Sequence, residues 1–171
     1  MPCHHTIVLF HPQIPQNTGN IVRTCSVTGT SLTLVRPLGF STSDHYLKRA
    51  GLDYWNEVEI TYINDLIEYL EKTDLPFYFF SSHATSDYTE ITYEPNAMLI
   101  FGSETSGLPQ EIHEKYPDRL VKIPMLEDKR CLNLATSVGI GLYEAIRQNR
   151  QTGGSHLHRA DQQDDSLLSH L

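Results

Sequence analysis

Asn17, Asn20 and Arg23 form the first group of residues whose types and spacing could do chemistry. They lie in the run Pro15-Gln16-Asn17-Thr18-Gly19-Asn20-Ile21-Val22-Arg23-Thr24, directly after an apolar segment. The side-chain oxygen of Asn17 is placed to cap a helix, and Asn20 and Arg23 share a face near its N-terminus, an end that binds anions. An ordinary capped helix with a surface arginine explains the same residues, so this segment alone leaves both interpretations open.

A second polar group occupies a glycine-rich loop after the apolar segment Leu99-Ile100-Phe101. The loop reads Gly102-Ser103-Glu104-Thr105-Ser106-Gly107, and Pro109 can open the helix that follows, because its missing N–H is harmless there. Glycines allow the backbone to approach a ligand closely. Glu104 could act on that ligand or could be a plain capping carboxylate for exposed amides. The absence of a following Gly-Lys-Ser/Thr argues against a phosphate-binding loop.

A third segment combines the end of a strand at Pro124 with an irregular loop and a helix that begins near Asn133. Backbone N–H and C=O groups in such a loop are not used by regular structure, so they can bind the edge of an adenine base. Asn133 at the start of the helix is a candidate for orienting a ribose. Each of the three segments is weak evidence by itself.

The pattern of apolar and helical segments predicts an α/β fold, a mostly parallel sheet with helices on both faces. Buried strands are expected at Thr6–Phe10, Leu32–Arg36, Phe77–Ser81, Met98–Gly102 and Leu120–Ile123. Helices are expected at Thr18–Thr28 closed by Gly29, Asp44–Ala50 closed by Gly51, Asn64–Lys72, Pro109–Tyr116 and Leu132 to about Arg150.

The last predicted helix carries small residues opposite its apolar stripe, among them Gly139 and Gly141. A glycine inside a helix costs about 1 kcal/mol relative to alanine, so two of them predict close approach of a neighbouring backbone or side chain. That neighbour is either another part of the same subunit or a second subunit at a dimer interface.

Length and composition bound the kind of protein. A chain of 171 residues suits one domain, which we place at residues 1–150, and residues 151–171 change to Gln, Gly, Ser, His and Asp without periodicity, as in a disordered tail. No membrane-spanning run or signal segment is recognised, and the three cysteines lack metal or redox spacing, so we expect a cytoplasmic protein with reduced thiols.

The net charge of −8 argues against an indiscriminate nucleic-acid binder, although a local basic patch could still grip RNA. The residues that could form the patch are Arg23, Arg36, Lys48, Arg49, Lys129 and Arg130. His4, His5 and His11 could suggest a metal site, but no His/Cys spacing fits one, and no metal is expected.

Taken together and in this order, the three segments resemble the motifs of the SPOUT RNA methyltransferases, and residues 7–150 are similar to the TrmL subfamily. The resemblance is carried by the runs Gln13–Arg23, Arg49–Tyr54, Phe101–Pro109, Ile123–Met125 and Leu132–Leu134, with Tyr143-Glu144-Ala145. It implies a deep trefoil knot in the last third of the chain, a homodimer through that region, and bound S-adenosylmethionine. The implied reaction is 2′-O-methylation of the wobble cytidine or uridine in leucine tRNAs.

The resemblance also assigns roles by position. A catalytic role is implied for Asn17, Asn20, Arg23, Glu104 and Asn133. The cofactor pocket is implied to be lined by Phe80, Gly102, Ile123, Cys131 and Leu132. Arg49, Arg130 and Tyr143 are candidates for contacts to RNA. For Tyr143, packing against a partner helix is an equal alternative.

Two positions depart from the family pattern, which has serine where Cys131 and Ala135 stand. A thiol is only a weak donor, so a binding hydroxyl lost at residue 131 would cost about 1 kcal/mol of cofactor affinity, and a binding backbone group would cost little. Two alternative functions follow: a SPOUT enzyme acting at another RNA site, and a knotted protein that binds RNA or the cofactor without catalysis.

Overall fold

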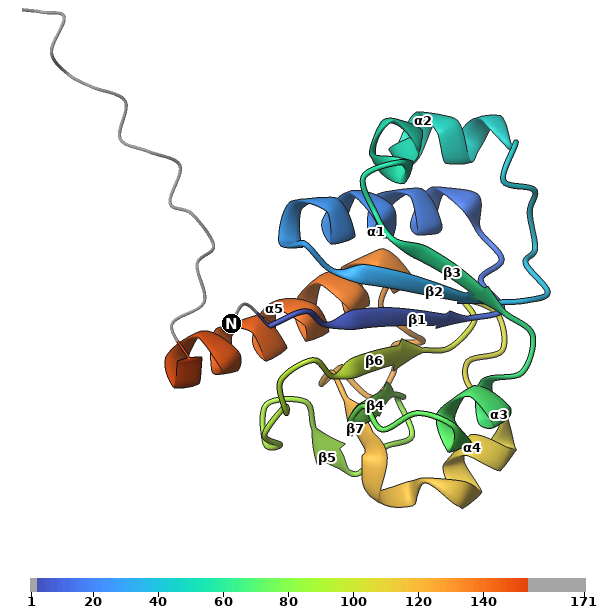
Figure 1. The fold of residues 1–171 in the computed structure, drawn as a ribbon. Coiled ribbons are helices and arrows are strands. Elements are labelled where there is room, and N and C mark those ends of the chain that lie inside the picture. Colours follow the sequence, from blue (N-terminus) through green and yellow to red (C-terminus); the bar gives the residue numbers. More distant parts are fainter. Residues whose placement is uncertain (1–2, 154–171) are drawn as a thin grey trace, which may run out of the picture.

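Seven parallel strands form one sheet in the computed structural model, which describes residues 3–153 (Figure 1). The order across the sheet is β3-β2-β1-β6-β4-β7-β5, and every paired strand runs parallel to its neighbour. The strands are β1 (Thr6–Phe10), β2 (Ser31–Val35), β3 (Ile60–Ile63), β4 (Phe77–Phe80), β5 (Ser86–Asp87), β6 (Met98–Phe101) and β7 (Leu120–Lys122). The prediction of a mostly parallel α/β sheet is confirmed.

Helices cover both faces of this sheet because side chains alternate between the two faces along each strand (Figure 1). The helices are α1 (Pro15–Thr28), α2 (His45–Trp55), α3 (Leu66–Glu71), α4 (Gln110–Lys115), the 3-10 helix η1 (Pro117–Arg119) and α5 (Leu134–Gly153). Ile7 and Leu9 of β1 share a core with α1 and α5, whereas Val8 between them faces α3 and α4. Helix α2 packs on the outside of α1.

The start of α1 differs from the prediction. The helix begins at Pro15, with the proline in its first turn and Ile14 as a cap residue that makes no side-chain hydrogen bond. Asn17 therefore lies inside the first turn, and the prediction that it caps the helix is wrong. Proline has no backbone N–H that would need an acceptor in the first turn, so the helix can begin at Pro15, before the predicted start at Thr18. The end of α1 is as predicted, since Gly29 adopts the left-handed conformation with φ 68°.

Helix α2 also runs further than predicted, because Gly51 lies inside it and the helix continues to Trp55. The partly buried side chains of Tyr54 and Trp55 pack against the main core and stabilise this extra turn. Strands β3 and β5 were not predicted. β3 lies at one edge of the sheet with Thr61 exposed, and β5 has only two residues.

The C-terminal helix is slightly longer than expected and ends at Gly153, so residues 151–153 of the predicted tail are helical. The rest of that tail, residues 154–171, lies outside the described residues. Within residues 3–153, no helix has the length and apolar character needed to cross a membrane.

Gly141 explains part of the small-residue face of α5. A Cβ at this position would lie 2.6 Å from Cζ of Phe80 and 3.3 Å from Cζ of Phe101, whose rings stack with centroids 4.5 Å apart. A Cβ at Gly139 would meet no atom of the described residues within 4 Å. Close packing within the subunit therefore explains Gly141.

Gly141→Ala should lower the free energy of unfolding by about 1–2 kcal/mol, because overpacking the Phe80 ring outweighs the better helix propensity of alanine. The matched control is Gly139→Ala, which adds the same methyl group in open space and should raise stability by up to about 1 kcal/mol. Urea unfolding of the two variants checks this. Equal stability of both variants would contradict the contact described here.

Candidate functional site

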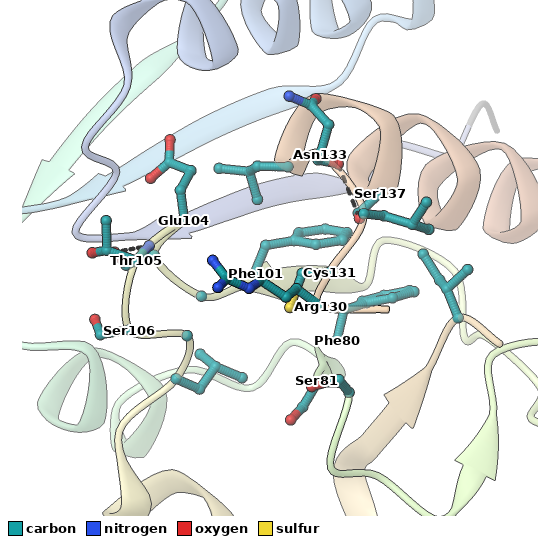
Figure 2. Close-up of a pocket in the computed structure, with 18 of the residues that line it drawn as sticks. Phe80, Ser81, Phe101, Glu104, Thr105, Ser106, Arg130, Cys131, Asn133 and Ser137 are labelled. Carbon is teal, nitrogen blue, oxygen red and sulfur yellow. Dashed lines mark hydrogen bonds between the residues drawn. The ribbon is translucent and has the colours of Figure 1, made fainter. Parts of the chain in front are cut away.

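One open pocket lies where the carboxyl ends of the central strands meet. Parallel strands deliver the loops after their carboxyl ends to one edge of a sheet, which is where open α/β sheets bind ligands. The pocket has a volume of about 530 Å³, within the range of small-molecule sites. Its walls come from the loop after β4, the loop after β6, the segment after β7 and the start of α5 (Figure 2).

Aromatic rings and a tight glycine loop shape this pocket. Phe80 ends β4 and Phe101 ends β6, and their stacked rings both line the pocket (Figure 2). Ser103 and Gly107 exchange backbone hydrogen bonds of 3.2 and 2.9 Å, which closes the loop between them. A Cβ at Gly102 would lie 2.3 Å from the carbonyl carbon of Gly107, so only glycine fits there.

Three segments distant in sequence are connected by a chain of side-chain hydrogen bonds. The carboxylate of Glu104 accepts from the backbone N–H groups of Gln13 and Ile14, at 2.8 and 3.1 Å. It also accepts from Nδ2 of Asn17 at 3.3 Å, and Oδ1 of Asn17 in turn accepts from Nδ2 of Asn133 at 2.9 Å. Glu104 thus holds the backbone that leads into α1, and Asn17 connects Glu104 to Asn133 just before α5.

The structure brings together most of the residues predicted for the site. The pocket lining includes Asn17, Phe80, Gly102, Glu104, Ile123, Arg130, Cys131, Leu132 and Asn133. The four remaining predicted residues, Asn20, Arg23, Arg49 and Tyr143, are exposed on α1, α2 and α5, outside that lining. Arg23 lies over the ring of Tyr54, with its guanidinium carbon 5.3 Å from the ring centroid.

Ser81 and His113 are pocket residues that the sequence analysis missed. Ser81 directly follows β4, and its Oγ lies 2.9 Å from Nε2 of His113 on α4. The position of Ser81 in the sequence could have identified it as a pocket residue, because a polar residue right after a buried parallel strand lies at the ligand-binding edge of the sheet. No sequence signal identifies His113, since its contact to Ser81 spans 32 residues.

Cys25 and His5 lie outside the pocket and are buried. Burial raises the pKa of the Cys25 thiol to about 12, which leaves it an inert apolar side chain. Burial also lowers the pKa of His5, whose Nδ1 lies 3.3 Å from the carbonyl oxygen of Ala97. Among residues 3–153, no three His, Cys, Asp or Glu side chains are placed to hold a metal ion.

Glu104→Gln should lower the free energy of unfolding by about 1–3 kcal/mol, because an amide NH2 would then face a backbone N–H and leave it without an acceptor. Glu127→Gln, at an exposed carboxylate, is the control and should change stability by less than about 0.5 kcal/mol. Chemical denaturation measures both. A Glu104→Gln protein as stable as the control would show that the connection between the loops contributes nothing.

Known proteins resemble this chain over most of its length. The model of the SpoU rRNA Methylase family matches residues 4–143. A Bacillus subtilis protein is 46% identical over 148 residues, which cover 83% of this chain and 91% of the relative. A tRNA (cytidine(34)-2′-O)-methyltransferase of Yersinia pestis is 40% identical over 149 residues, covering 83% of this chain and 92% of the relative.

Two solved structures extend the likeness to the fold. A structure described as giving insights into the 2-OH methylation of C/U34 on tRNA has a TM-score of 0.82 and 39% identity, and the match covers 88% of this chain and 99% of that one. An AdoMet-bound rRNA methyltransferase of Sinorhizobium meliloti has a TM-score of 0.76 and 25% identity, covering 86% and 57% of the two chains. The chain therefore belongs to the SpoU rRNA Methylase family.

Proposed function

We propose that this protein is an S-adenosylmethionine-dependent tRNA 2′-O-methyltransferase that acts in the cytoplasm on the wobble cytidine or uridine of leucine tRNAs. The observation that carries the proposal is the pocket at the carboxyl edge of the sheet, built by the three segments that the resemblance singled out. The Yersinia pestis relative, named for methylation of cytidine 34 in tRNA, supports the substrate class.

The residues of the pocket fit an adenosyl cofactor. Phe80, Ile123 and Leu132 offer apolar surface, and Gly102 keeps the adjacent loop close to the cavity. Cys131 lines the pocket with an exposed, free thiol. Because a thiol is only a weak hydrogen-bond donor, we assign cofactor binding at this position to the backbone groups of the loop. S-adenosylmethionine, when bound, supplies an electrophilic methyl group on its sulfonium, and the protein has to align the ribose oxygen with it.

Arg23 is assigned to the RNA side of the reaction. A guanidinium with a pKa above about 12 is a poor general base at neutral pH. We assign it to holding an RNA phosphate and stabilising the negative charge that develops on the 2′-oxygen, and the proton leaves through that phosphate or water. Arg23 is exposed over the ring of Tyr54, so its guanidinium is accessible to a large substrate. The side chains of Arg49 and Arg130 are exposed as well.

The knot and the homodimer complete the proposal. The segment that follows β7 lines the pocket beside the loop after β6, and α5 then packs against α1 and β6. We assign the trefoil knot to this part of the chain. Tyr143 on α5 is 50% exposed. We assign its side chain to contact with a second copy of the chain.

Arg23→Lys should reduce methyl transfer to tRNA by at least about 100-fold, because lysine keeps the charge but loses the bidentate geometry. The dissociation constant of S-adenosylhomocysteine should stay the same, since Arg23 lies outside the pocket lining. Labelled methyl incorporation and calorimetric titration measure the two quantities.

Arg119→Lys is the matched control, because Arg119 is also exposed and lies over an aromatic ring, 5.2 Å from the centroid of Phe77. It should transfer methyl groups at the wild-type rate. Near-normal transfer by the Arg23→Lys protein would exclude the bidentate role, and a weakened affinity for S-adenosylhomocysteine would place Arg23 in the cofactor site instead.

A further inference from the structure

The pocket has a second polar wall that the roles assigned so far do not use. Ser81 lies across the stacked rings of Phe80 and Phe101 from Glu104 and Asn133 (Figure 2). Ser82, His83 and His113 line the pocket with it. Polar groups at the wall of a largely apolar pocket are the ones that fix the orientation of a ligand.

The hydrogen bonds around Ser81 fix the direction of its hydroxyl group. Nδ1 of His113 lies 3.1 Å from the carbonyl oxygen of Pro109, which can only accept, so this nitrogen carries the proton. In the neutral ring, Nε2 is then an acceptor, and Ser81 Oγ–H donates to it at 2.9 Å. The backbone N–H of His83 donates to Ser81 Oγ at 3.2 Å.

This arrangement leaves Ser81 with one free lone pair and no free proton. A serine oxygen has two lone pairs and one hydrogen, of which His83 takes one lone pair and His113 takes the hydrogen. Toward the pocket, Ser81 is therefore an acceptor only. It selects a ligand group that carries N–H or O–H.

We propose that Ser81 is a cofactor-binding residue that accepts a hydrogen bond from an amine or hydroxyl group of S-adenosylmethionine. His113 is a positioning residue that acts through Ser81, because it holds the hydroxyl in the acceptor orientation. The inference rests on the proposed function, since it takes the adenosyl cofactor as the ligand. It adds to that function a polar contact on the wall opposite Glu104 and Asn133.

A double-mutant cycle tests the dependence of His113 on Ser81. The dissociation constant of S-adenosylhomocysteine is measured by calorimetry for the wild type, Ser81→Ala, His113→Leu and the double variant. Loss of one neutral hydrogen bond should weaken binding about fivefold in each single variant. The double variant should bind no more than about twofold more weakly than Ser81→Ala, because His113 has no separate contribution.

Two further variants separate positioning from general damage. His113→Gln keeps a side-chain acceptor that can face Ser81, so it should restore affinity to within about twofold of the wild type. Ser26→Ala, in which a hydroxyl that donates to Glu57 on another face is removed, should leave affinity unchanged. Thermal unfolding of each variant accompanies the titrations and identifies any loss that follows from unfolding.

Unchanged affinity in Ser81→Ala would overturn the proposal. A double variant weakened about 25-fold would also overturn it, because the two residues would then act independently. Loss of affinity in His113→Gln equal to that in His113→Leu would show that the imidazole serves packing. A wild-type protein that does not bind S-adenosylhomocysteine would contradict the proposed function itself, which none of the variant results does.

Discussion

The carboxylate of Glu104 accepts hydrogen bonds from two backbone N–H groups just before α1 and from the Asn17 side chain in its first turn, and the rest of the site depends on this interaction. Through Asn17 and Asn133 it connects the loops that follow β1 and β6 to the start of α5. A carboxylate that accepts several hydrogen bonds is a strong point of attachment between loops. These hydrogen bonds hold the three segments against one another beside the pocket.

The sheet order makes this connection possible. β1 and β6 are neighbours and run parallel, with Leu9 opposite Phe101, so the loops that follow them begin side by side. β4 pairs with β6 on its other side, and Phe80 opposite Phe101 brings the two rings into contact. The exposed Arg23, which we propose binds an RNA phosphate, lies on α1 and is therefore connected to the pocket through the contacts of Glu104 at the start of this helix.

Much of this arrangement could be predicted from the sequence, and the failures have physical causes. Short apolar runs such as Thr6–Phe10 identify buried strands directly, and the resemblance of the motifs to a known family placed Glu104 and Asn133 in one site. The edge strand β3 is only four residues long and none of its residues is buried, so it differs from the buried runs that were predicted. The contact between Glu104 and Gln13 joins residues 91 positions apart, so local sequence left open whether Glu104 caps or acts on a ligand.

The most direct test of the proposed function is the transfer of labelled methyl groups from S-adenosylmethionine to total tRNA by the purified protein, followed by nuclease digestion. We expect label in 2′-O-methylcytidine or 2′-O-methyluridine, recovered from the wobble position of leucine tRNAs. Label in a methylated base, or no label although the protein binds S-adenosylhomocysteine, would contradict it.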